Sequence, residues 1–207
     1  MEENITMWTG KEEASMTAGK PDQDLVLAGY MALAGSAVMT RQDRETLLTR
    51  LPEELIDQLL AFDSQRQAHK VMLQESALKE AGATAWFPLG EGGIFNGLWH
   101  MADHWGTGFT VQLKDLPVRQ ETIEVCEIEE KNPYYLHSEG CLLLAANHGD
   151  RVCAALRAQG IPAAVIGVLT NKKDKTLCHD STISCLNRPR QDELDVFFKE
   201  HGLTMPE

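Results

Sequence analysis

The sequence lacks long apolar runs and has few basic residues. The longest uninterrupted apolar stretch, residues 141–146, is six residues long, whereas a membrane-spanning helix needs roughly 20. Lysine and arginine total 19 against 31 acidic residues in a chain of 207, so the formal net charge is −12 at pH 7. Nucleic acids and anionic membrane surfaces are bound by concentrated positive charge, and no Lys/Arg cluster is present. We therefore expect neither nucleic acid nor a membrane as a partner.

Cysteine is scarce and shows no metal-binding or redox spacing. The five cysteines form no CxxC pair. Cys141 lies in the longest apolar run and Cys153 in a predicted helix, where a thiol acts as a small hydrophobic group. The first residues are acidic and do not resemble a secretory signal. These features predict reduced cysteines and a cytoplasmic protein.

The composition is that of a globular protein with one large domain and a short appendage. Hydrophobic residues make up 43% of the chain and charged residues 24%, which is enough apolar material for a sizeable core. Residues 1–23 have no sustained periodicity and include Gly10, Gly19 and Pro21. We predict a leader arm over 1–23, poorly structured or loosely docked, and a folded domain over 24–207.

The folded part alternates between strand and helix patterns. Strands are predicted at 24–28, 83–87, 109–113, 141–146 and 163–169, with a hairpin from 176–178 and 182–185. Helices are predicted at 52–62, 66–80, 94–105, 120–130, 150–159 and 192–200, and Gly35-Ser36 is expected to interrupt the segment 29–40. This alternation predicts an α/β (α+β) fold, in which helices cover a mixed β-sheet.

A glycine-rich turn is the first candidate site. Gly90, Glu91, Gly92 and Gly93 stand between a predicted strand and a predicted helix. Free amides at a helix N-terminus bind anions, and glycines let a phosphate approach the backbone closely. The turn matches neither a Walker A loop nor GxGxxG, and Glu91 places a negative charge where an anion would sit. A tight turn without a ligand is the alternative interpretation.

Two histidines are weak candidates for metal ligands. His100 and His104 are spaced four residues apart on a predicted helix, so both imidazoles lie on one face. The glutamate that follows the first histidine in zinc proteases is replaced by Met101. The neighbouring tryptophans favour a half-buried packing surface instead.

Three further patterns have simpler structural interpretations. In Cys178-His179-Asp180, adjacent side chains on an extended chain point to opposite faces and cannot form a triad, although Cys178 and Cys185 could pair across a hairpin. The acidic residues of 121–130 are interpreted as a solvated helix face. Ser138 has no base placed to activate it. We therefore assign no catalytic residue.

A resemblance to a known family rests on an ordered series of motifs. The main segments are EGGIFNGLW at 91–99 and LPVRQETIEVCE at 116–127. Additional matches are DLVL at 24–27, LAGSA at 33–37, NPY at 132–134, SEGCLLL at 138–144 and GIPAAVIG at 160–167. The chain resembles the C-terminal domain of aminoimidazole ribonucleotide (AIR) synthase-related proteins. That superfamily includes a hydrogenase maturation factor, selenophosphate synthetase and thiamine-monophosphate kinase.

The resemblance implies a mixed α/β domain that, in the family, joins an N-terminal domain carrying most of the ATP and Mg²⁺ site. Two departures bear on function. Only about 23 unpatterned residues precede the matching region. The family's loop His-Asp-Val-Thr-Glu-Gly-Gly corresponds to Phe-Pro-Leu-Gly-Glu-Gly-Gly at 87–93, and Phe87 and Pro88 can neither transfer protons nor bind metal. Only the glycine turn carries over, as a phosphate-facing or nucleotide-facing element.

These departures predict a stand-alone, non-catalytic homologue that acts as a binding or regulatory module. A face that the family packs against its N-terminal domain would be covered by self-association, by another protein, or by the leader with Met7, Trp8 and Met16. The alternative is one half of a split ATP-dependent enzyme, completed by a separate chain with the nucleotide domain. A metal or redox role through His100/His104 or Cys178/Cys185 is a third hypothesis.

Overall fold

A seven-stranded mixed sheet forms the centre of the protein. The structure is a computed structural model and describes residues 17–72 and 74–204. The strands are β1 (Asp24–Ala28), β2 (Ala85–Pro88), β3 (Gly108–Gln112), β4 (Leu142–Ala146), β5 (Ala163–Thr170), β6 (Lys175–His179) and β7 (Thr182–Cys185). Their order is β2-β4-β1-β5-β3-β6-β7, and β3 and β6 pair in parallel while the other neighbours are antiparallel. The mixed sheet and the hairpin of β6 and β7 confirm the predicted α/β (α+β) class.

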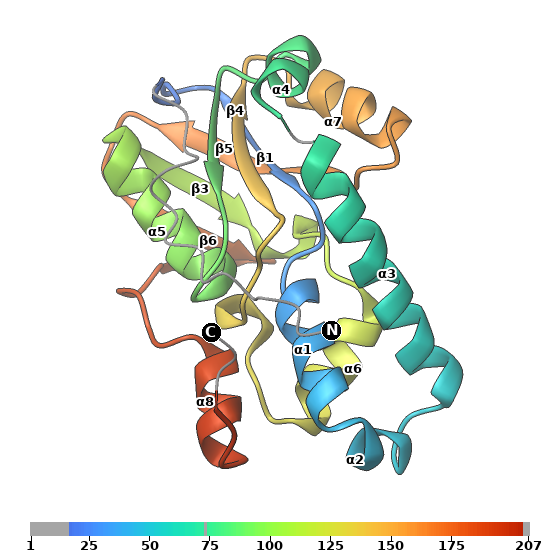
Figure 1. The fold of residues 1–207 in the computed structure, drawn as a ribbon. Helices are drawn as coiled ribbons and strands as arrows, with labels where there is room; N and C mark the ends of the chain where they lie inside the picture. The colour runs from blue at the N-terminus through green and yellow to red at the C-terminus, as the bar shows by residue number, and fades with distance from the viewer. Residues whose placement is uncertain (1–16, 73, 205–207) are drawn as a thin grey trace.

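The central strand β1 shows why the sheet is covered on both faces. Its residues alternate between two separate apolar clusters, as the period of two in a strand requires. Leu25 and Leu27 pack into the cluster that contains α5 (Gly93–Trp105), and Val26 and Ala28 pack into the cluster that contains α7 (Gly149–Ala158) and Leu78 of α4 (Glu75–Ala81). In Figure 1, α5 lies on one side of the strands and α7 with α4 on the other.

A group of helices forms a third apolar cluster beyond the end of the sheet. It consists of α1 (Leu33–Gln42), α2 (Arg44–Leu48), α3 (Glu53–Met72), α6 (Gln120–Ile128) and α8 (Glu193–Glu200). Figure 1 shows α1, α2, α6 and α8 together in the lower half, with the long α3 running upward from them towards α4. Leu33, Ile56, Val125 and Phe197 are among its fully buried side chains, each from a different helix.

Three helix boundaries differ from the sequence predictions. The expected break at Gly35-Ser36 is absent, because α1 runs through both residues, and the side chain of Leu136 packs where a Cβ on Gly35 would lie. The two helices predicted at 52–62 and 66–80 are divided elsewhere: α3 continues to Met72 and α4 is separate. The helix continues through the predicted gap at 63–65, where the buried carboxylate of Asp63 binds Arg66 on the same helix and Arg41 on α1. The short helix α2 was not predicted.

The predicted leader arm lies mostly outside the described residues, and its last seven residues, 17–23, are described. Thr17 Oγ1 donates to the carbonyl of Thr84, and Gln23 Nε2 donates to Thr84 Oγ1 and Asn147 Oδ1. Gly19 is buried so closely that a Cβ there would lie 2.6 Å from Leu169. These residues therefore pack on the ends of the strands. Met7, Trp8 and Met16, which we expected to cover an apolar face, lie outside the described residues.

No helix in the described segments combines the length and the apolar character that crossing a bilayer requires.

Candidate functional site

The glycine turn connects β2 to α5 as predicted, and a side chain binds its amide. Gly92 and Gly93 have φ of +72° and +65°, a region that favours glycine. A Cβ on Gly92 would lie 1.7 Å from Asn96 Nδ2, so glycine is also required by space. The Gly92 N–H donates to Asp192 Oδ2 at 2.6 Å. The amide that a phosphate would use is therefore bound to a carboxylate of the same chain.

The Asp192 carboxylate also accepts hydrogen bonds from two further backbone amides. Its Oδ1 accepts from His137 N at 3.1 Å and from Leu194 N at 2.7 Å, and the residue is only 2% exposed. The bond to Leu194 makes Asp192 the N-cap of α8. Three amides from three segments thus surround one carboxylate, in the manner of an anion-binding nest. The nest is filled by the protein itself.

The electrostatic surroundings of the turn are negative. Burial raises the pKa of the Asp195 carboxyl, and the nearby charges of Asp192 and Glu91 raise it further. Three acidic groups thus lie around the turn, where they oppose the approach of a phosphate. The turn keeps its predicted position, and its assignment as a nucleotide-facing element, Gly90, Glu91, Gly92 and Gly93, stays a prediction.

Phe87 and Pro88, the residues that replace the polar pair of the family's loop, belong to β2. They pair with Leu143 and Leu142 of β4 and are buried. Phe87 packs into the apolar cluster beneath α5. These side chains contribute to the core and offer no proton-transfer or metal-binding group.

The predicted histidine pair lies on the surface of α5. His100 and His104 are both exposed, and the ring of His104 contacts that of Phe87 at 5.9 Å between centroids. Among the described residues, neither belongs to a group of three or more metal-ligating side chains. A two-histidine metal site stays a prediction.

The other sequence patterns have structural roles. Cys178 and Cys185 are both free, and Cys178 is paired in register with Ile183 rather than with Cys185. Ser138 Oγ donates to the carbonyl of Leu136 and accepts from the amide of Ala32, so its hydroxyl is fully used in a buried turn.

The interpretation of residues 121–130 as a solvated acidic face was wrong at two positions, because Glu121 and Glu129 are buried. Burial alone would raise the pKa of Glu121, but the hydrogen bonds from Arg119, a backbone hydrogen bond and the Arg119 charge together lower it below its ordinary value. The sequence pattern could not show that Arg119, two residues away, holds this carboxylate.

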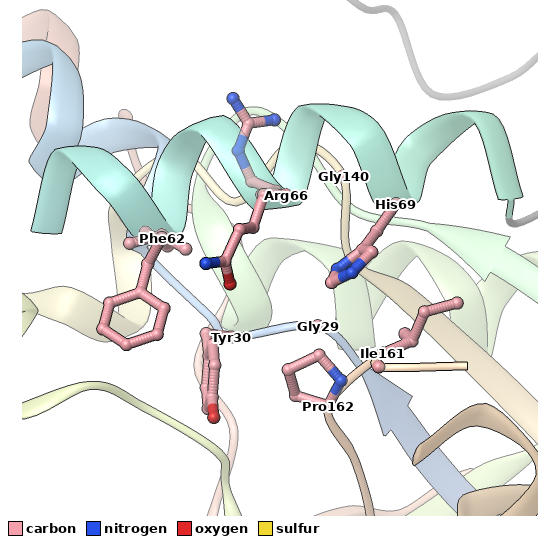
Figure 2. Close-up of a pocket in the computed structure, with 11 residues that line it drawn as sticks. Gly29, Tyr30, Phe62, Arg66, His69, Gly140, Ile161 and Pro162 are labelled. Carbon is pink, nitrogen blue, oxygen red and sulfur yellow. The ribbon is translucent and has the colours of Figure 1, made fainter. Parts of the chain in front are cut away.

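A pocket that sequence analysis did not predict lies between α3 and the turns at one end of the sheet (Figure 2). It encloses about 210 Å³ and is lined by residues of α3, the turn after β1, the turn before β4 and the turn between α7 and β5. Its glycines, Gly29, Gly140 and Gly160, leave space between these segments. The lining comes from four distant parts of the chain, which is why no local motif reveals it.

The pocket wall is mainly apolar and aromatic, and its polar side chains include those of Gln65, Arg66 and His69. Figure 2 shows His69 projecting from α3 towards Ile161 and Pro162, with Phe62 and Tyr30 on the other side. The Arg66 guanidinium is directed away from Tyr30 and donates to Asp63 and to the carbonyl of Glu139. Its charge is already compensated by Asp63, so the pocket suits an uncharged ligand better than an anion.

The comparisons with known proteins define the class of the chain. Residues 20–180 match the family model "AIR synthase related protein, C-terminal domain". The chain belongs to this family, as its motifs predicted. A sequence search of curated proteins finds no match.

Solved structures share the fold at low sequence identity. One is a HypE-HypF complex, with 20% identity, a TM-score of 0.61, and coverage of 84% of this chain and 55% of that one. Another is the hydrogenase maturation protein HypE in complex with ATP (17%, TM-score 0.60, 87% and 55%). A third is AaThiL complexed with AMPPCP and TMP (16%, TM-score 0.54, 84% and 52%). The chain spans just over half the length of these proteins, and the likeness shows the fold alone.

Proposed function

We propose that this AIR synthase-related domain is a non-catalytic binding module. The observation that carries the proposal is the hydrogen bond from Gly92 N–H to Asp192, within a nest of three amides around one buried carboxylate. A phosphate at this amide would have to displace the Asp192 carboxylate and bring a second negative charge beside it in a buried position, which is unfavourable. The negative groups around the turn and the apolar Phe87 and Pro88 support the same conclusion.

The pocket of Figure 2 is the proposed ligand site. Its volume of about 210 Å³ is below the roughly 300–1,000 Å³ of drug-sized sites, so the ligand is small. The aromatic rings of Phe62 and Tyr30, with the imidazole of His69 and the amide of Gln65, suit a flat, uncharged ring that accepts or donates hydrogen bonds. The free cysteines support a reducing, cytoplasmic location.

Calorimetric titration with Mg²⁺-ATP, followed by an assay for released ADP, tests the non-catalytic proposal. We expect neither heat nor turnover from the wild-type chain. If the wild-type chain does bind Mg²⁺-ATP, binding that survives in a Gly92→Asp variant would exclude the glycine turn as the site. Turnover in the wild type would overturn the proposal.

An NMR titration tests the pocket independently. The probes are imidazole, indole and adenine, and the expected result is chemical-shift change confined to residues around His69. A His69→Ala variant should lose the response, while the matched variant His100→Ala, at an exposed histidine on α5, should keep it. An equal response from both variants would contradict the assignment.

The second candidate function is one half of an ATP-dependent enzyme with Mg²⁺, completed by a nucleotide-binding chain. It is favoured by two structural neighbours in complex with ATP and with AMPPCP, and by coverage of only about half of those proteins. The HypE-HypF neighbour likewise supports a protein partner, and self-association into a homodimer is the other way to cover the face that the family packs against its N-terminal domain. In this case Mg²⁺-ATP binding requires the added chain, and analytical ultracentrifugation of the protein alone distinguishes a homodimer from a monomer.

A further inference from the structure

The C-terminal ends of three helices converge on one point of the helical cluster. Asp43, Glu129 and His201 are the residues that directly follow α1, α6 and α8. One ligand atom from each lies within 4.8 Å of the others, the one such group of three found among the described residues. Helix C-termini carry partial negative charge and favour a cation. The C-termini of α1, α6 and α8 and the carboxylates of Asp43 and Glu129 meet at this point.

The imidazole of His201 is oriented for metal binding. Its Nδ1 lies 2.9 Å from the carbonyl oxygen of Phe197. A carbonyl only accepts hydrogen bonds, so Nδ1 carries a proton and Nε2 is the nitrogen that faces away from the helix carbonyl. Nε2 lies 3.7 Å from Asp43 Oδ2 and 3.7 Å from Glu129 Oε2. Nε2 is therefore the ring nitrogen that is placed to bind a metal ion together with the two carboxylates.

An independent observation at Glu129 also points to a ligand at this cluster. Its side chain is only 5% exposed, and its buried Oε1 has no hydrogen-bond partner among the described residues. Buried polar atoms are nearly always paired, so this oxygen needs an explanation. Asp43 is held in place through its other oxygen, Oδ1, which accepts from Thr46 Oγ1 at 2.7 Å. Its Oδ2 remains directed to the cluster.

Nearby positive side chains do not complete the site. Lys131 Nζ donates to the backbone carbonyl of Glu129 and to the carboxylate of Glu200. Burial raises the pKa of Glu129, the charge of Asp43 raises it further, and His201, Lys131 and Arg50 only partly oppose these effects. A divalent cation would neutralise both carboxylates.

We propose that Asp43, Glu129 and His201 bind one divalent first-row transition-metal ion, with Zn²⁺ the best match. Ca²⁺ and Mg²⁺ prefer oxygen ligands alone, whereas imidazole with carboxylates suits Zn²⁺. In a tetrahedral site with bonds of about 2.0–2.1 Å, neighbouring ligand atoms lie about 3.3 Å apart. The two separations from His201 are 3.7 Å, and all three ligand atoms lie within 4.8 Å of one another, so the side chains must move closer together to bind the ion. The side chains of Asp43 and His201 are partly exposed, which leaves the fourth position to water.

The ion would tie α8 to α1 and α6, and the inference is independent of the proposed binding function. The test uses the full chain without a histidine tag, stripped with a chelator and titrated with Co²⁺ as a spectroscopic probe. Zn²⁺ then competes for the same site. We expect one ion per chain, with visible absorption of a tetrahedral Co²⁺ site that Zn²⁺ abolishes.

Glu129→Gln and a double variant, His100→Ala with His104→Ala, form the matched comparison. Glu129→Gln should weaken Zn²⁺ binding at least tenfold, while the double variant should bind as the wild type does. Because Glu129→Gln removes a buried charge and keeps the shape, the fold should survive, and thermal unfolding checks this. Zn²⁺ should raise the unfolding temperature of the wild type and not that of Glu129→Gln.

His201→Ala provides a second variant at a more exposed position, so a folding failure at Glu129 does not prevent the test. Equal Zn²⁺ affinity in the wild type and in both site variants would overturn the proposal. Loss of binding in the double variant alone would assign the ion to the α5 histidines and would likewise overturn it. So would the absence of binding in the wild type.

Discussion

At the scale of single residues, Asp192 decides how the glycine turn is used. It lies 100 positions after Gly92 in the chain, and its carboxylate accepts a hydrogen bond from the Gly92 N–H. Charge-assisted hydrogen bonds are about twice as strong as neutral ones, so the carboxylate is a strong competitor for any external anion. The residue types of the turn predict a phosphate site. In the structure, however, the carboxylate of Asp192 from the C-terminal region accepts the hydrogen bond from the Gly92 amide at the centre of this turn.

Cysteine reactivity is the first prediction at this scale. Burial raises the pKa of Cys126 and of Cys141 to about 12, and burial also raises that of Cys153. Only Cys185 is exposed. Because the thiolate is the reactive form, a titration with Ellman's reagent should show one fast thiol in the native protein and five after unfolding. A Cys185→Ser variant should lose the fast phase, and a second fast thiol would contradict the burial pattern.

The buried ion pair of Glu121 predicts a pH-dependent stability. Burial is the largest single effect and would raise the pKa of Glu121, but the hydrogen bonds from Arg119, a backbone hydrogen bond and the Arg119 charge together lower it below its ordinary value of 4.5. A lowered carboxyl pKa stabilises the fold above the ordinary pKa, and this stabilisation is lost as the pH falls through the lowered value. We expect Glu121→Gln to reduce the free energy of unfolding by about 1.5–3 kcal/mol at pH 7.

Urea unfolding of Glu121→Gln at a series of pH values measures this effect. The difference from the wild type should shrink below pH 4.5, as the wild-type carboxyl becomes protonated. Glu127→Gln, at an exposed position on the same helix, is the control and should change little. A difference that is independent of pH would show that packing, and not charge, causes the loss.

At the scale of elements, α3 depends on one buried carboxylate. Asp63 is 1% exposed and accepts from Arg41 on α1 at 2.6 Å and from Arg66 at 2.7 Å. Arg66 in turn donates to the carbonyl of Glu139, next to Gly140 in the pocket wall. The chain of contacts joins α1, α3 and the turn before β4, which explains why a single helix spans residues that we predicted as two.

Removal of Asp63 should therefore cost much more than removal of an exposed acid on the same helix. Asp63→Ala leaves Arg41 and Arg66 without their carboxylate, and we expect a loss of about 3–5 kcal/mol in the free energy of unfolding. Asp57→Ala, which removes an exposed pair with Arg44, should cost less than about 1 kcal/mol. Chemical denaturation compares the two, and equal losses would mean that burial of the pair contributes nothing.

At the scale of the whole molecule, the excess of negative charge opposes folding. The formal net charge of −12 at pH 7 produces self-repulsion in the compact state, and added salt screens it. We expect the unfolding temperature at pH 7 to rise by about 2–4 °C between about 10 mM and about 300 mM NaCl. The effect should vanish near pH 5.0, the isoelectric point. Scanning calorimetry measures both, and a fall with salt at pH 7 would show that attractive ion pairs dominate.

Most strands and the boundaries of several helices could be predicted from the sequence, because they depend on local periodicity. The uninterrupted apolar run at residues 25–28 already indicates a strand that is buried on both faces. The spacing of Ile94, Leu98 and Met101 indicates α5. The motifs 91–99 and 116–127 further indicated the family. These signals lie within a few residues of one another, where the period of the backbone sets which side chains share a face.

Only the tertiary structure decided the partners of the functional groups. The glycine turn was recognisable, but its occupant, Asp192, lies 100 residues away. The pocket around His69 draws on four segments, and the group of Asp43, Glu129 and His201 joins three helix ends far apart in the chain. Hydrogen bonds and metal coordination act over a few ångströms in space and leave no local pattern in the sequence. Composition and periodicity therefore determined the class of this protein, and long-range packing determined its sites.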